Sequence, residues 1–224
     1  MRYWKNALLL TLVLVLVAAP ASAWSPHKHH KGIEGSGKME TRTLDVDTFD
    51  KIDIGGAFDL HVTFGNKQMV KVTIDDNLWD NLVAEVQGGQ LELDWDKSCH
   101  PDGDCEIEIV VRRLEEVSIH GAADVDIEDF DGDRFGYYLS GAGDLRMDGK
   151  VDDLEIKVSG AGSADTRDLK AKHVNVTVSG AGDASVYASE SIKARVSGVG
   201  DVKYWGNPKD HDTRVSGIGS IKKR

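Results

Sequence analysis

A short glycine-containing turn occurs in six copies in the C-terminal half of this chain, and its spacing constrains the fold more than any other feature. The full copies read Ser-Gly-X-Gly followed by Asp or Ser, and a degenerate first copy reads His-Gly-Ala-Ala-Asp. A phosphate-binding glycine loop occurs once and opens onto a helix. Repetition at a fixed short period is instead typical of a solenoid. The copies start 18 to 20 residues apart, at His120, Ser140, Ser159, Ser179, Ser197 and Ser216.

Apolar and polar residues alternate on both sides of each turn. Ile156 and Val158 precede one copy, and Leu145 and Met147 follow another, each pair separated by one polar residue. A period of two is the pattern of a half-buried strand, and no stretch of the repeats has sustained helical spacing. We therefore predict an all-β fold, a parallel β-helix (β-solenoid) with about 19 residues per coil. Equivalent strands would pair in parallel about 4.8 Å apart.

Each coil is expected to contain a strand, a Gly-X-Gly corner, a second strand and a shorter third side. Both glycines of a corner are available for the positive φ that a sharp bend requires. The serines that precede the glycines would satisfy hydrogen bonds of the turn. We expect the residue between the glycines to point inward and fill a narrow interior, at Ala142, Ala161, Ala181, Val199 and Ile218.

The N-terminus has the pattern of a signal peptide over residues 1–23. Arg2 and Lys5 precede an apolar run over residues 7–19, and Ala21-Ser22-Ala23 is a small-residue cleavage signal. The run is too short to span a bilayer, which takes about 20 residues. We therefore predict an exported protein without a transmembrane span, located in the periplasm, in the cell envelope or outside the cell.

Removal of residues 1–23 takes away two positive charges, so the formal net charge moves from −11 to −13. A chain this acidic is a poor general binder of nucleic acid. Residues 24–38 form a polar, aperiodic stretch that we interpret as a flexible leader. Its histidines, His27, His29 and His30, are a weak and unselective set of metal ligands.

Residues 39–119 are predicted to be a β region continuous with the solenoid coils of residues 120–224. Within this region, residues 84–95 have the pattern of a hairpin about Gly88-Gly89. Residues 75–82, which read Asp-Asp-Asn-Leu-Trp-Asp-Asn-Leu, are compatible with one helical turn.

The chain has two cysteines, Cys99 and Cys105, separated by a short Pro-Asp-Gly turn. An even count in an exported protein favours a disulfide that closes a tight loop. The alternative is a metal site of Cys99, His100 and Cys105, which would offer three ligands at best and lacks the usual CxxC spacing. We predict the disulfide.

The order of motifs resembles a known bacterial family. Phe-Asp-Lys-Ile-Asp-Ile-Gly-Gly-Ala-Phe-Asp from Phe49, then residues 72–95, then tandem Ser-Gly-Ala-Gly-Asp coils, are similar to the head GIN domain, an auto-transporter adhesin-like domain. The likeness spans about residues 49–220. It implies that the β-helix is right-handed, a property that the repeat period alone leaves open. The family brings no catalytic residues to this chain.

One column of acidic residues follows the turns, and three roles are open to it. Carboxylates about 5 Å apart on neighbouring coils match the separation in retaining glycosidases, and they could also ligate Ca²⁺. The role that we favour is capping, in which each carboxylate accepts hydrogen bonds from backbone N–H groups of the turn. The column contains Asp124, Asp144, Asp183 and Asp201, with Ser163 and Ser220 at the same position.

Basic residues gather on the outer positions of the last two coils. Charges at the end of a solenoid protect an open strand edge, and the same residues are a candidate patch for an anion or a glycan. They are Lys193, Arg195, Lys203, Arg214 and Lys222.

Three functions remain compatible with these patterns. The favoured one is a non-enzymatic, adhesin-like binding module without a cofactor, whose partner is a component of a cell surface or envelope such as a polysaccharide. The alternatives are a polysaccharide lyase or hydrolase and a calcium-stabilised envelope module. Parallel β-helices do carry polysaccharide enzymes, but a shared fold is only an analogy.

Overall fold

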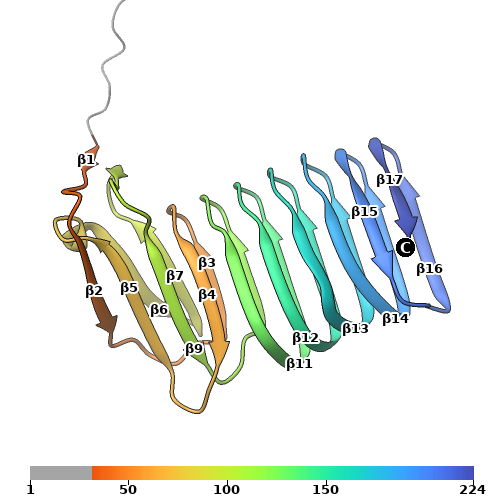
Figure 1. The fold of residues 1–224 in the computed structure, drawn as a ribbon, viewed down its shortest axis with the longest axis horizontal. Coiled ribbons are helices and arrows are strands. Elements are labelled where there is room, and N and C mark those ends of the chain that lie inside the picture. The colour runs from red at the N-terminus through yellow and green to blue at the C-terminus, as the bar shows by residue number, and fades with distance from the viewer. Residues whose placement is uncertain (1–31) are drawn as a thin grey trace, which may run out of the picture. The chain divides into compact units, whose positions relative to one another are not determined.

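The computed structural model describes residues 32–224 of the chain (Figure 1). The predicted signal peptide and most of the predicted leader, including His27, His29 and His30, lie outside the described residues. No helix long and apolar enough to cross a membrane occurs in the described part.

Seventeen strands and one 3-10 turn make up residues 32–224. In chain order they are β1 (Ile33–Glu34), β2 (Met39–Leu44), β3 (Lys51–Ile54), β4 (Asp59–Phe64), β5 (Met69–Asp75), η1 (Trp79–Asn81), β6 (Leu82–Gln87), β7 (Gln90–Trp95), β8 (Cys99–His100), β9 (Glu106–Val111), β10 (Glu116–Ile119), β11 (Val125–Leu139), β12 (Leu145–Val158), β13 (Ala164–Val178), β14 (Ala184–Val196), β15 (Val199–Trp205), β16 (Asp210–Val215) and β17 (Ile218–Lys223).

The repeats form a parallel β-solenoid, as the sequence predicts. Each strand from β10 onward pairs in parallel with the equivalent strand of a neighbouring coil (Figure 1). Val176 on β13, for example, lies between Ile156 and Ala194. Val176 and Val178 are both fully buried, and burial of a valine side chain contributes about 1.5–3 kcal/mol. The alternating columns therefore build one continuous apolar interior.

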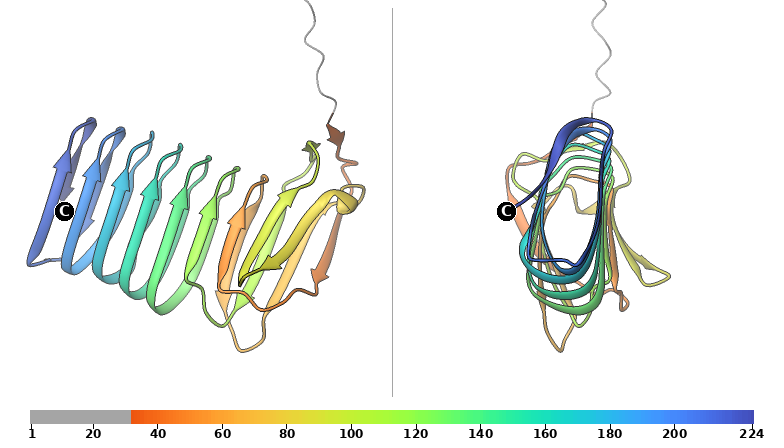
Figure 2. Two further views of the ribbon diagram at one scale, coloured as in Figure 1. Left: turned by 180° about the vertical axis from the view of Figure 1, so that it is seen from behind. Right: turned by 90° about the vertical axis from the view of Figure 1, so that its right-hand side faces the viewer.

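Seen along its length, the solenoid is a flattened ring with two long sides (Figure 2). The strands that lead into the Gly-X-Gly corners form the pre-corner side, and those that leave the corners form the post-corner side. The predicted short third side is the lower bend of the continuous strands β11 to β14. Its inward residues include Val151 on β12 and Leu169 on β13, and both are buried.

The corners differ from the sequence prediction in where their middle residues point. Ala142 and Ala161 are exposed, and so are Val199 and Ile218, with 56% and 75% of their surface accessible. The prediction of inward fillers was therefore wrong. The reason is the close stacking of corners, because Ala142 N–H donates to the carbonyl of Gly121 one coil away. A side chain at this position has room only on the outside.

The two glycines of a corner have different roles. The second glycine takes a positive φ in the corners of Gly143, Gly162, Gly200 and Gly219, at 141° in Gly143, but not at Gly182. Gly160, a first glycine, has no positive φ. A Cβ added at Gly160 would overlap the backbone carbonyl oxygen of Gly141 on the neighbouring coil. The first glycine is therefore required by close approach of two backbones, and the second by both approach and conformation.

The solenoid begins before the first copy of the turn that the sequence repeat reveals. β3, Gly55-Gly56-Ala57 and β4 form an earlier coil, in which β3 pairs with β10 and β4 pairs with β11. Ala57 bridges to Ala122 at the corner. β7 and β9 lie one level further out, paired in parallel with β3 and β4.

Antiparallel strands cover this N-terminal end of the stack. β6 pairs with β7, β5 pairs with β9, and β2 pairs with β5. The β6–β7 connection is the predicted hairpin, with Gly88 and Gly89 at φ 61° and 83°, and the predicted helical turn is η1. The antiparallel strands occupy backbone groups that a parallel stack would leave open at its first strand.

We predict that Gly160→Ala lowers stability by about 3 kcal/mol or more, because the new methyl group overlaps backbone that two coils hold in place. Thermal and urea unfolding followed by circular dichroism measure the effect. The matched control is Ala161→Ser at the adjacent, exposed corner position, where a change within about 0.5 kcal/mol is expected. Equal effects of the two substitutions would contradict the explanation.

Candidate functional site

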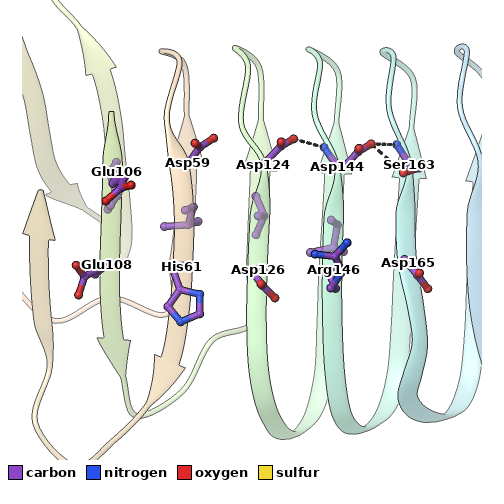
Figure 3. A pocket seen from close by; sticks show the side chains of 14 residues that line it. Asp59, His61, Glu106, Glu108, Asp124, Asp126, Asp144, Arg146, Ser163 and Asp165 are labelled. Carbon is purple, nitrogen blue, oxygen red and sulfur yellow. Dashed lines mark hydrogen bonds between the residues drawn. The ribbon is translucent and has the colours of Figure 1, made fainter. Parts of the chain in front are cut away.

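Two rows of outward side chains run across neighbouring coils on the post-corner side, and we call this surface the two-row face (Figure 3). It is carried by β9, β4, β11, β12 and β13, whose parallel registers align equivalent positions. The row nearest the corners contains Glu106, Asp59, Asp124, Asp144 and Ser163. The second row contains Glu108, His61, Asp126, Arg146 and Asp165.

The strand period explains why two rows form. A buried column of Ile107, Leu60, Val125, Leu145 and Ala164 lies between them. Residues on either side of an inward residue must point outward. Because the register is maintained from coil to coil, each row places one side chain on every strand.

A groove of about 560 Å³ lies over these side chains. A second cavity of about 430 Å³, near the lower bend, shares Asp126, Arg146 and Asp165 with the first. Carboxylates dominate the groove lining, and Arg146 and His61 are the only basic side chains in it among the described residues. The groove is therefore a negatively charged, hydrogen-bond-accepting surface.

The acidic column of the corner row links successive coils through backbone hydrogen bonds. Asp124 Oδ1 accepts from the N–H of Asp144 at 2.9 Å, and Asp144 Oδ1 accepts from the N–H and hydroxyl of Ser163 at 2.7 and 2.8 Å (Figure 3). Asp183 and Asp201 repeat the arrangement further along the stack. The carboxylates cap backbone N–H groups, but on the next coil rather than in their own turn.

Hydrogen bonds lower the pKa of Asp201, the last carboxylate of this column. The hydroxyl and N–H of Ser220 hold the pKa of Asp201 below its usual value. The serines of the corners act on carbonyls instead, because Ser159 Oγ donates to the carbonyl of Leu139 at 3.1 Å. Ligation of Ca²⁺ by the column stays a prediction that these contacts do not test.

The surroundings of Asp59 shift its pKa in the opposite direction to that of Asp201. Burial raises the pKa of its carboxyl group, and the nearby charges of Asp124, Asp104 and Glu106 raise it further. Asp59 and Asp124 occupy adjacent positions of the corner row on β4 and β11. Asp59 therefore holds its proton more tightly than an ordinary Asp, a property that the acid of a catalytic carboxylate pair also has.

The second row is partly neutralised by ion pairs. Arg167 lies 2.6 Å from Asp165 and lowers the pKa of that carboxyl group. Lys71 on β5 lies 2.6 Å from Glu108. Arg146 is in register with both Asp126 and Asp165, without a contact to either below 4 Å. In the middle of the row, Asp126 and the adjacent Arg146 carry opposite charges without a direct contact.

The five basic residues predicted as a patch are divided between the two long sides (Figure 1). Lys193, Arg195 and Arg214 lie on β14 and β16 of the pre-corner side, where Arg195 contacts Asp212 at 2.9 Å. Lys203 and Lys222 are neighbours on β15 and β17 of the post-corner side. Binding of an anion at these residues stays a prediction.

Cys99 and Cys105 are free thiols in the structure, so the predicted disulfide is not formed there. Both lie in the segment that connects β7 to β9, and the charge of Cys99 contributes to the pKa of Cys105. Burial raises the pKa of Cys105 to about 11, and it also raises that of Cys99. Little of either thiol is ionised at neutral pH, and the thiolate is the reactive form.

We predict that the protein forms the Cys99–Cys105 disulfide under oxidising conditions and that reduction lowers stability by about 2 kcal/mol, the value expected for a short closed loop. Thiol titration in denaturant counts free cysteines, and melting curves with and without dithiothreitol measure the stability. The double variant Cys99→Ser/Cys105→Ser should not respond to the reductant. Two free thiols in protein isolated from the envelope would contradict the prediction.

The sequence repeat missed four of the ten residues of the two-row face. His61, Asp59, Glu106 and Glu108 precede the first recognised turn, so they were not candidates. The available signal was Ile54-Gly55-Gly56-Ala57-Phe58-Asp59, which has the glycines and the following Asp of a corner in altered order. The parallel pairing of β4 with β11 brings these residues beside Asp124 and Asp126.

We predict that Asp59→Asn raises the melting temperature at pH 7, because it removes a partly desolvated carboxylate that lies among like charges. A raised pKa in the folded protein contributes stability that is present at low pH and is lost as the pH rises through that pKa. The gain should therefore shrink as the pH is lowered toward about 4, the usual value for Asp. Melting curves between pH 3.5 and 7.5 measure it.

The control for this experiment is Asp47→Asn, an exposed carboxylate outside the two rows. It removes the same formal charge outside the groove of the two-row face. A gain of equal size and pH dependence in both variants would show that net charge, rather than the surroundings of Asp59, causes the effect.

Comparison with known proteins gives a family match and several solved structures. Residues 48–208 match the family described as "Putative auto-transporter adhesin, head GIN domain". A structure of a "putative adhesin" from Bacteroides fragilis is similar to this chain, with 26% identity and a TM-score of 0.71. The alignment covers 86% of this chain and 100% of that one.

A second structure, a "putative adhesin" from Parabacteroides distasonis, shares 18% identity and a TM-score of 0.55, over 86% of this chain and 99% of that one. At this identity the likeness shows the fold alone. No match was found among curated proteins.

Proposed function

Because the chain belongs to the head GIN domain family of adhesin-like proteins, we propose that it is an exported, non-enzymatic binding module of the cell envelope or the extracellular space. The two-row face is the surface that binds. The predicted signal peptide supports export, and the family supports a role in attachment.

The observation that carries this proposal is the regular, open groove of the two-row face. Five parallel strands present two polar side chains each at coil-to-coil spacing, over a groove of about 560 Å³. Backbone hydrogen bonds between coils hold the strands, so binding does not require the surface to become ordered. A long, rigid, shallow surface of this kind fits an extended polymer.

The chemistry of the lining selects among polymers. Carboxylates accept hydrogen bonds from hydroxyl groups, which polysaccharides carry on every residue. The same carboxylates repel polyanions such as nucleic acid and acidic glycans. We therefore assign neutral or amino-substituted polysaccharides as the ligand class, with Arg146 as the one strong donor in the middle of the second row.

We predict that the protein binds a subset of neutral or basic polysaccharides on a glycan array, and that Arg146→Ala weakens this binding at least about tenfold. A lost hydrogen bond from a charged group corresponds to about 1.5–3 kcal/mol. Arg195→Ala is the matched control, since Arg195 lies on the opposite long side. Isothermal titration with the best polysaccharide measures both variants.

The outcome also decides between the two surfaces. Binding could be lost in Arg195→Ala but not in Arg146→Ala, together with a preference for acidic glycans. That result would show that the predicted basic patch, rather than the two-row face, binds the ligand. Absence of binding to every glycan would overturn the assigned ligand class.

One observation favours a second candidate function, a polysaccharide hydrolase. Asp59 has a raised pKa and adjoins Asp124, and retaining glycosidases pair a protonated acid with an ionised carboxylate. The same polysaccharides, assayed for new reducing ends, test it. Product release that disappears in Asp59→Asn would replace the binding module with this enzyme.

A further inference from the structure

Three side chains that can bind a metal ion lie close together on the two-row face, where β4 pairs with β11. They are the imidazole of His61 and the carboxylates of Asp126 and Glu128, and one ligand atom from each lies within 4.8 Å of the others. We propose that these three side chains bind a divalent transition-metal ion, with Zn²⁺ as the expected occupant. The proposal does not depend on the polysaccharide assignment.

The fold fixes two of the ligands directly. His61 and Asp126 are register partners on adjacent parallel strands, so their side chains leave the sheet side by side (Figure 3). Both are partly buried, whereas Glu128 is exposed. Atoms bound to one tetrahedral zinc ion lie about 3.3 Å apart, given bond lengths of about 2.0–2.1 Å. The three ligand atoms would have to approach one another to bind one ion, and Glu128 is the ligand that is exposed to solvent.

The backbone changes direction directly after the third ligand. The register between β11 and β12 shifts between Ile127 and Phe130. Asp129 has φ 55°, the only positive value at a non-glycine residue in the described part of the chain. Its N–H is held by Asp148 Oδ1 at 3.1 Å. Bulges of this kind re-aim neighbouring side chains and are frequent beside functional sites.

The three side chains are unpaired within the described part of the chain. Within residues 32–224, none of the three side chains forms a hydrogen bond within 3.5 Å or an ion pair within 4.0 Å with another protein group. The flanking charges in the second row are Glu108, which is paired with Lys71, and Arg146. Two neighbouring carboxylates repel one another, and a bound cation removes that repulsion.

The donor set favours a transition metal over calcium. Imidazole nitrogen suits Zn²⁺, Ni²⁺ and Cu²⁺, whereas Ca²⁺ takes six to eight oxygen ligands. Three protein ligands leave at least one coordination position for water or for a group of a bound molecule. That position would face the groove of the two-row face.

The test is a Zn²⁺ titration of the purified, untagged protein in which His27, His29 and His30 are changed to Ala. Calorimetry and melting curves with Zn²⁺, Ca²⁺ and Mg²⁺ measure binding, because a ligand of the native state raises the melting temperature. The variants are His61→Gln and Asp126→Asn. The control is His173→Gln, a surface histidine on the pre-corner side.

We expect a Zn²⁺ site whose affinity falls at least about tenfold in His61→Gln and in Asp126→Asn, while His173→Gln retains it. The circular dichroism spectra of the metal-free proteins should agree. Equal Zn²⁺ affinity in all four proteins would overturn the proposal, and so would stabilisation by Ca²⁺ but not by Zn²⁺. Substitution of Co²⁺ provides a second readout, because its visible absorption changes when a nitrogen ligand is lost.

Discussion

The backbone ladder between coils is the constraint on which the rest of this structure depends. Parallel hydrogen bonds continue from the strands around the corners, so that each coil is bonded to the next along both long sides and at the turn. This contact brings backbones so close that Gly160 has no room for a side chain. The same ladder fixes the register that aligns the outward residues, and the rows of the two-row face are its direct result.

Periodicity made the fold predictable from the sequence, because the same glycine turn and the same alternation of apolar and polar residues occur in six copies. The parallel pairing, the buried columns around Val176 and the hairpin at Gly88-Gly89 were all accessible from alternation and turn chemistry. The direction of the middle corner residues, such as Ile218, was not. It depends on how closely successive corners stack, and that distance has no signature in one coil.

The candidate site was predictable only in part, for a related reason. Asp124 and Asp144 stood out because they repeat. Asp59 and His61 belong to a coil whose corner sequence has diverged, and they join the rows only through the pairing of β4 with β11. The basic residues failed to form one surface because positions before and after a corner lie on opposite sides of a flattened ring. Alignment of the repeats shows which residues of successive coils stack on one another. It does not show which of these aligned positions lie on the same side of the solenoid.

The carboxylate caps of the corner row have a consequence for how such a molecule changes its length. Each cap bonds the coil that follows it, and no contact in that series spans more than one coil. A unit of about 19 residues is therefore self-sufficient at both of its boundaries. Duplication or deletion of one unit keeps the backbone ladder between coils and extends or shortens the exposed surface by one coil, so that gene rearrangement can change the length of the molecule in steps of one coil.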